Sequence, residues 1–126
     1  MRIKDSLIVF FLLMFVFSAC KKKAGIGGKK TIDGIVTYKN GATSTFEKAN
    51  AAMVHIAYGT KNATSNYNQT IVADDQGAYH FDGLNKGDYF ITANYTDANG
   101  FKYSSSGYGL TVNNNKDRLT IEFKLQ

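Results

Sequence analysis

Proline and tryptophan are absent from this sequence of 126 residues, and cysteine occurs once. A chain without proline must form its turns from its 12 glycines and from Asn and Asp, which is typical of β-hairpins rather than of helix bundles. Because Cys20 is the one cysteine, no disulfide can form within the chain. The length is that of a single domain, so one packed core must hold the fold together.

Positive charge is concentrated in one short segment. The net charge of the whole chain is +5. Residues 20–30 carry five lysines and no acid, whereas residues 31–126 carry 8 basic and 9 acidic side chains. A domain that binds nucleic acid usually has a basic face of its own. The nearly neutral remainder of this chain therefore argues against nucleic acid as a partner.

The N-terminus has the organisation of a secretion signal, which we place at residues 1–19. Arg2 and Lys4 precede an unbroken apolar run over residues 7–17. A membrane-spanning helix needs about 20 apolar residues, so this run suits the hydrophobic region of a signal peptide instead. Phe17-Ser18-Ala19-Cys20 resembles the bacterial lipobox, in which the cysteine becomes the first residue of the mature protein and is acylated.

The lipobox resemblance implies that Cys20 carries acyl chains such as palmitate and anchors the protein to membrane lipid in the cell envelope. Each buried methylene contributes about 0.8 kcal/mol, so several chains hold a protein on a membrane almost irreversibly. Residues 20–30 would then be a basic tether of Gly and Lys. Lysines rather than acids follow Cys20, which favours the periplasmic face over the cell surface. The alternative is an ordinary secretory signal beside a chance cysteine.

Beyond residue 31, apolar side chains recur with a period of two, which predicts strands. The clearest case is the C-terminal segment, where apolar residues at 119, 121, 123 and 125 alternate with polar ones. Similar alternation covers residues 32–38, 53–58, 79–81 and 89–95, with weaker candidates at 71–73 and 110–112. Turns rich in Gly, Asn and Asp separate these segments. About seven strands at this spacing predict a β-sandwich.

The order of motifs is similar to that of the carboxypeptidase regulatory-like domain. The matching segments are Gly34-x-Val36, Asn40-Gly41, residues 51–56, Asp74-x-x-Gly77-x-Tyr79-x-Phe81-x-Gly83-Leu84 and residues 87–93. The resemblance implies an all-β fold, a single seven-stranded Greek-key β-sandwich of the transthyretin (prealbumin-like) type, over residues 31–126. It also implies a non-catalytic accessory, adhesive or scaffold module.

The matching residues have structural roles. Gly77 and Gly87 stand where hairpins need a positive φ. We expect four side chains to face the core, namely Tyr79, Phe81, Tyr89 and Ile91.

Residues that could perform catalysis or hold a metal are few. His55 and His80 both fall on the outward phase of predicted strands, and no zinc-ligand spacing such as HExxH is present. Asp74 and Asp97 stand in turns that offer too few oxygen ligands for Ca²⁺, and we interpret them as turn-forming residues. Transthyretin-like hydroxyisourate hydrolases end in Tyr-Arg-Gly-Ser, whereas this chain ends in Phe-Lys-Leu-Gln. We therefore expect no enzymatic activity, no metal and no cofactor.

A candidate ligand surface is formed by tyrosines around the serine-rich loop at residues 104–107. The four tyrosines are Tyr67, Tyr95, Tyr103 and Tyr108. Tyrosine is also common on sheet surfaces that bind nothing. Two functions remain open. The first is a membrane-anchored, non-catalytic lipoprotein that presents a β-sandwich interaction module to an envelope protein or glycan. The alternative is a lipoprotein that binds a glycan or small solute through the tyrosine-rich loop.

Overall fold

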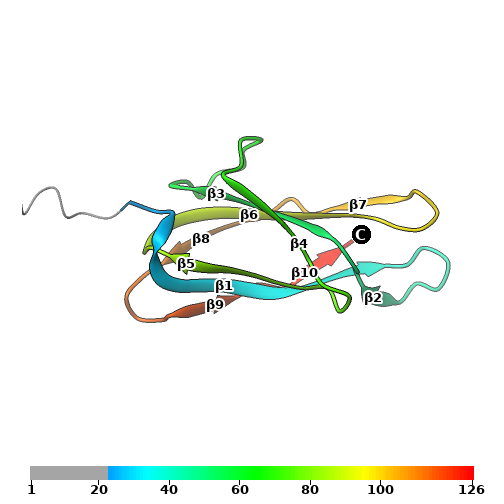
Figure 1. The fold of residues 1–126 in the computed structure, drawn as a ribbon. Helices are drawn as coiled ribbons and strands as arrows, with labels where there is room; N and C mark the ends of the chain where they lie inside the picture. The colour runs from blue at the N-terminus through cyan, green and yellow to red at the C-terminus, as the bar shows by residue number, and fades with distance from the viewer. Residues whose placement is uncertain (1–22) are drawn as a thin grey trace, which may run out of the picture.

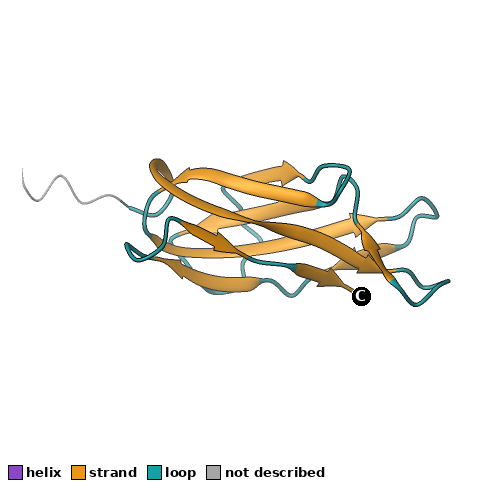
Figure 2. Ribbon diagram, turned by 90° about the horizontal axis from the view of Figure 1, so that it is seen from below, coloured by secondary structure: helices purple, strands orange, loops and turns teal. Residues whose placement is uncertain are grey.

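A computed structural model describes residues 23–126, so the predicted signal peptide and Cys20 lie outside the described residues. Within that range the chain forms strands and loops, with two five-stranded sheets packed face to face (Figures 1 and 2). None of the described residues forms a helix long and apolar enough to cross a bilayer. The expectation of an all-β sandwich is confirmed.

The described residues contain ten strand segments. They are β1 (Ile26–Lys39), β2 (Phe46–Lys48), β3 (Met53–Tyr58), β4 (Gln69–Val72), β5 (Ala78–Leu84), β6 (Gly87–Thr96), β7 (Lys102–Ser104), β8 (Tyr108–Val112), β9 (Arg118–Thr120) and β10 (Phe123–Leu125). Seven strands were expected. The number differs partly because two edge strands are interrupted: one consists of β7 and β8, and the other of β9 and β10. In addition, the three-residue strand β2 is too short to show an alternation that could be predicted.

The long strand β1 lies at the centre of the first sheet. On one side it pairs antiparallel with β5 and β2, and on the other it pairs parallel with β9 and β10. The second sheet has the order β4-β3-β6, and the free edge of β6 pairs with β8 over its first half and with β7 over its second half. Each sheet is thus built around one long strand that spans the domain.

The core fills the space between the two sheets. Its largest fully buried side chains are Tyr89, Phe81, Phe123, Ile32, Ile56, Leu84, Ile91, Leu125, Val36 and Val54. The prediction that Tyr79, Phe81, Tyr89 and Ile91 face the core is confirmed, because all four are buried. Burying an apolar side chain of this size contributes roughly 1.5–3 kcal/mol. The period of two in the sequence therefore reflects the main source of stability.

The last strand is interrupted where it passes Gly34. The Ile121 N–H donates to the Asp33 carbonyl at 2.7 Å, and the Ile121 carbonyl accepts from the Tyr79 hydroxyl at 2.6 Å. A side chain at position 34 would overlap the Ile121 carbonyl oxygen. The strand predicted over residues 119–125 is therefore two segments, joined by a bend that needs glycine beneath it and that Tyr79 holds.

The segment expected to be a tether is structured from Ala24 onward. The Gly25 N–H donates to the Tyr89 hydroxyl at 2.8 Å, and the Gly25 carbonyl accepts from the Asn85 N–H at 2.8 Å. The Asn85 side-chain amide also donates to the Lys23 carbonyl at 3.0 Å. The boundary expected at residue 31 is thus too late, because the chain joins the sandwich at Ala24 and β1 begins at Ile26.

Two of the predicted turn glycines have the conformation expected of them. Gly77 has φ 75° and Gly87 has φ 148°. At Gly87 a side chain would also collide with Ala24, which packs against this turn. The Asn40-Gly41 dipeptide, by contrast, is not a two-residue hairpin turn. It begins a longer loop in which the Asn40 N–H donates to the Thr45 carbonyl at 2.9 Å, and the residue with positive φ is Ser44.

Candidate functional site

The strand β1 runs the length of the domain, and different loops and hairpins lie at its two ends (Figure 1). At the end near Ile26, which we call the N-terminal end, β1 meets the turn between β5 and β6 and the loop between β8 and β9. At the end near Lys39, which we call the hairpin end, lie the β1–β2 and β6–β7 hairpins and the C-terminus.

The four tyrosines singled out from the sequence do not converge on one site. Tyr95 and Tyr103 are direct partners across β6 and β7, with ring centroids 6.2 Å apart. Tyr67 lies on the outer face of the second sheet, and Tyr108 packs on Phe123 of the first sheet with centroids 5.3 Å apart. Period-two alternation places a residue on a face of its strand but does not say which strands are neighbours.

A cluster of three tyrosines links the hairpins at the hairpin end. The Tyr38 ring lies 4.5 Å from that of Tyr95 and 5.1 Å from that of Tyr103. The Tyr38 hydroxyl donates to the Glu47 carboxylate at 3.0 Å, and this bond, with burial, raises the pKa of Tyr38 well above its ordinary value. The Tyr103 hydroxyl donates to the Asp97 carboxylate at 3.3 Å. These contacts make the cluster a structural bridge between the two sheets.

Tyr67 stacks on His55, with ring centroids 4.8 Å apart, and its hydroxyl accepts from Thr92 at 3.3 Å. His55 Nδ1 lies 2.7 Å from Thr70 Oγ1, and Asn94 Nδ2 lies 3.1 Å from His55 Nε2. An amide NH₂ group can only donate, so Nε2 accepts and Nδ1 carries the proton donated to Thr70. Burial lowers the pKa of His55 below its ordinary value of 6.5, which favours the same neutral ring.

The two histidines lie on the outer faces of different sheets, as their outward phase predicts. His55 belongs to β3, and His80 belongs to β5, where its Nδ1 lies 2.8 Å from the Asp82 carboxylate. Within residues 23–126, no group of three or more His, Cys, Asp or Glu side chains is arranged to hold a metal ion.

The aspartates at the loop positions are turn residues, as expected. The Asp74 carboxylate accepts from the Gln76 and Ala78 N–H groups, both at 2.9 Å. The Asp97 carboxylate accepts in the same way from the Asn99 and Phe101 N–H groups, again at 2.9 Å. Each side chain satisfies the backbone of its own loop, which confirms the interpretation as turn-forming residues.

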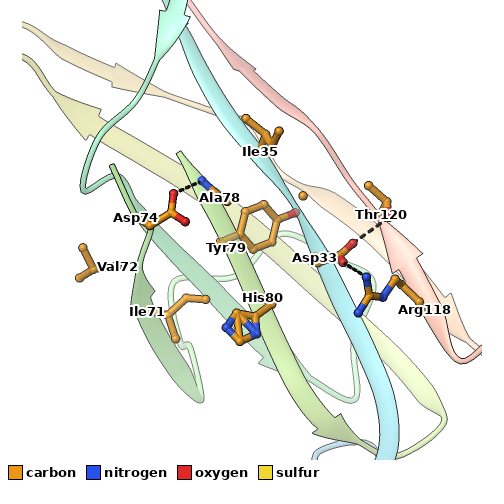
Figure 3. Close-up of a pocket in the computed structure, with 11 residues that line it drawn as sticks. Asp33, Ile35, Ile71, Val72, Asp74, Ala78, Tyr79, His80, Arg118 and Thr120 are labelled. Atoms are coloured by element: carbon orange, nitrogen blue, oxygen red, sulfur yellow. Dashed lines mark hydrogen bonds and ion pairs between the residues drawn. The ribbon is translucent and has the colours of Figure 1, made fainter. Parts of the chain in front are cut away.

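A shallow cavity of about 590 Å³ lies beside the outer face of the first sheet (Figure 3). It is lined by Asp33, Gly34, Ile35, Ile71, Val72, Asp74, Ala78, Tyr79, His80, Arg118 and Thr120. Asp33 organises its polar side, because its carboxylate accepts from Thr120 at 2.7 Å and pairs with Arg118 at 3.1 Å. The cavity therefore combines an apolar wall with a row of donors and acceptors.

Sequence reasoning missed this cavity because its residues come from four strands that are far apart in the chain. Asp33 lies opposite His80 of β5 on one side and opposite Thr120 of β9 on the other. The available signal was that all three polar residues occupy the outward phase of their strands. That signal cannot place β9 beside β1, because nothing in the local sequence indicates that strands from opposite ends of the chain pair in parallel.

Comparison with known proteins supports the fold and goes no further. No protein-family model and no curated protein matches the chain. Among solved structures, the D312A variant of BcpA, the major pilin subunit of Bacillus cereus, superposes with a TM-score of 0.52 at 17% identity over 79% of this chain. The present chain spans only 30% of that pilin.

A second similar structure is a Pseudomonas aeruginosa protein that has been provisionally assigned as carbohydrate-binding. It superposes with a TM-score of 0.51 at 14% identity and covers 85% of this chain and 93% of its own length. At these identities both similarities concern the β-sandwich fold alone.

Proposed function

We propose that this protein is a lipid-anchored, non-catalytic accessory module of the bacterial cell envelope, on the periplasmic face. Acylated Cys20 would hold it on the membrane, and the sandwich would present an interaction surface to an envelope protein. The module would belong with the carboxypeptidase regulatory-like domains, as a seven-stranded Greek-key sandwich in which each interrupted edge strand is counted once and the short β2 is left out.

The observation that supports this proposal is the separation of the two ends of the domain. The chain enters the sandwich at Ala24, four residues after Cys20, and β1 then runs for 14 residues to the hairpin end. At about 3.3 Å per residue, β1 spans roughly 45 Å. The point where the chain enters the sandwich and the hairpins therefore lie at opposite ends of the domain, so an anchor at Cys20 would leave the hairpins at the end away from it.

The hairpin end has the exposed apolar side chains that an interaction surface needs. Phe46 of β2 is 45% exposed, and Phe101, next to β7, is 65% exposed. Aromatic side chains are enriched where proteins bind one another. Because the tyrosine cluster fixes both hairpins, these side chains would be presented on a preorganised scaffold.

The anchor can be tested in cells grown with a clickable palmitate analogue. Wild-type protein should be labelled and should fractionate with membranes, whereas Cys20→Ser should lose both the label and the membrane fraction. Lys22→Ser is the matched control, because it changes a neighbouring residue and leaves the cysteine, and it should behave as wild type. Equal labelling of wild type and Cys20→Ser would refute the anchor.

A second candidate function is glycan binding, which the cavity favours. Its row of Asp33, Arg118 and Thr120 can exchange hydrogen bonds with sugar hydroxyls, while Ile71 and Val72 can contact an apolar sugar face. The similarity to a protein assigned as carbohydrate-binding is consistent with such a ligand.

Screening the protein against a glycan array would separate the cavity from the tyrosine-rich loop. Binding in the cavity should fall at least tenfold in Arg118→Ala and stay unchanged in Tyr108→Ala. The opposite result would favour the loop predicted from the sequence, and no binding by wild type would remove the glycan candidate altogether.

A further inference from the structure

Five exposed lysines gather at the N-terminal end of the sandwich from segments far apart in the sequence. They are Lys23, Lys29, Lys61, Lys86 and Lys116. None of the five forms an ion pair with a carboxylate of residues 23–126, whereas Lys30 nearby pairs with Asp117 at 2.7 Å. The fold thus collects positive charge that the described part of the protein leaves unneutralised.

The charge is unevenly divided along the long axis. The half nearer the N-terminal end holds seven basic side chains and four acids, namely Lys23, Lys29, Lys30, Lys61, Lys86, Lys116, Arg118, Asp33, Asp82, Asp88 and Asp117. The hairpin half holds four lysines and five acids, namely Lys39, Lys48, Lys102, Lys124, Glu47, Asp74, Asp75, Asp97 and Glu122. One end of the domain is therefore positive and the other slightly negative.

An apolar side chain projects from the same positive end. Ile26 is 70% exposed, although it is the first residue of β1 and pairs with Leu84. The neighbouring backbone is held rigidly, because the Asn85 amide donates to the Lys23 and Ile26 carbonyls at 3.0 and 3.3 Å. An exposed apolar residue at the same end as several exposed lysines is the composition of surfaces that rest on lipid headgroups.

The distance from Cys20 limits where this end can lie. Lys23 is three positions after Cys20, and a fully extended chain covers at most about 3.6 Å per residue, or about 11 Å over this distance. This distance is close to the screening length of about 8 Å at physiological ionic strength. If Cys20 is acylated, Lys23 therefore stays close to the membrane surface, and the N-terminal end is the end of the sandwich nearest the bilayer.

We propose that the N-terminal end of the sandwich is a docking face for anionic lipid headgroups, which sets the long axis pointing away from the bilayer. This proposal rests on the anchoring of Cys20. Each lysine near an anionic surface favours the docked state by about fivefold, so Lys61, Lys86 and Lys116 together favour it by about 100-fold. These three belong to loops of the sandwich and are independent of the lysines beside Cys20.

The test uses the full acylated protein reconstituted in vesicles of phosphatidylcholine alone or with 30 mol% phosphatidylglycerol. With Cys20 acylated, an engineered cysteine is a unique labelling site, so a fluorophore is placed in Asn114→Cys at the N-terminal end or in Thr43→Cys at the hairpin end. Energy transfer to an acceptor on the headgroups then reports how far each end lies from the bilayer. In anionic vesicles, transfer from position 114 should exceed transfer from position 43, and the difference should narrow in phosphatidylcholine alone.

Two triple Lys→Gln variants, one at each end of the sandwich, test whether the lysines of the N-terminal end cause the docking. The triple variant Lys61→Gln, Lys86→Gln, Lys116→Gln should behave in anionic vesicles as wild type does in phosphatidylcholine, whereas Lys39→Gln, Lys48→Gln, Lys102→Gln should behave as wild type. Equal effects of the two triple variants, or no dependence on phosphatidylglycerol, would overturn the docking face. Failure of the wild-type protein to float with either vesicle would refute the anchor instead.

Discussion

Substituting Tyr89 by Phe is the sharpest test of how the N-terminal segment is held. The Tyr89 side chain is fully buried, and its hydroxyl donates to the Asn85 carbonyl at 2.6 Å while accepting from the Gly25 N–H at 2.8 Å. One oxygen atom thus joins the β5–β6 turn to the residue at which the chain enters the sandwich. Phenylalanine preserves the ring and its packing and removes only the contacts of the hydroxyl, which include a third, longer one of 3.4 Å to the Gly25 carbonyl.

The expected loss follows from what the substitution leaves behind. Gly25 is buried, so its N–H would have no partner in Tyr89→Phe, and a buried unsatisfied donor costs about 1–3 kcal/mol. We therefore expect the free energy of unfolding to fall by about 2 kcal/mol. For a domain of this size, 1 kcal/mol corresponds to about 4–8 °C, so Tm should fall by about 8–16 °C.

The assay is urea unfolding followed by circular dichroism, with Tyr58→Phe as the matched control. The Tyr58 hydroxyl is in a half-buried side chain and donates to Gln69 at 3.2 Å, so its removal should cost less than about 1 kcal/mol. Hydrogen exchange at the Gly25 amide should also accelerate in Tyr89→Phe alone. If the two variants lose the same stability, the hydroxyl of Tyr89 does not hold the N-terminal segment.

Three further predictions concern stability. Gly34→Ala should cost about 3 kcal/mol in urea unfolding, because a methyl group there overlaps the Ile121 carbonyl, whereas Gly41→Ala, with open space around it, should cost less than about 0.5 kcal/mol. The pKa of His55 is lowered in the folded protein, so as pH drops the unfolded chain protonates at this residue first. The free energy of unfolding should therefore fall below about pH 6.5, and His55→Gln should show less of that loss. Burial raises the pKa of Tyr79, so stability should fall above about pH 10, where the unfolded chain ionises first. Tyr79→Phe should show less of that loss, and an equal loss in wild type and variant would contradict a buried Tyr79 hydroxyl.

The strands that could be predicted are those with one face buried in the core and the other exposed to solvent. In β6, Tyr89, Ile91 and Ala93 are buried, as alternation indicates. Phe90 is on the opposite phase and yet is only 5% exposed. Its partner across the sheet is Gly109, and a side chain there would overlap the backbone of Lys61, so the loop after β3 covers this part of the outer face.

The start of β1 could not be predicted from apolar alternation. Residues 26–30 read Ile-Gly-Gly-Lys-Lys, which is typical of a linker. They form a strand because Gly28 lets the backbone approach the Leu84 carbonyl closely and because the Asn85 amide binds the carbonyls on either side of Gly25. These are backbone contacts made by a distant turn, and they leave little trace in the local sequence.

The candidate sites depend still more on which strands are neighbours. Tyr95 and Tyr103 could be suspected as a pair, because a short hairpin joins β6 to β7. The cavity beside Asp33 requires the parallel pairing of β1 with β9. The gathering of lysines requires the β3–β4 loop, the β5–β6 turn and the β8–β9 loop, which carry Lys61, Lys86 and Lys116, to lie at the same end. Neither arrangement follows from alternation alone.

Mass spectrometry of the N-terminal peptide from membrane-purified protein tests the central claim most directly. The account predicts that residues 1–19 are missing and that the first residue is Cys20, carrying a thioether-linked diacylglycerol and an amide-linked acyl chain. A mature protein that begins at another residue, or one in which Cys20 has a free thiol, would contradict it.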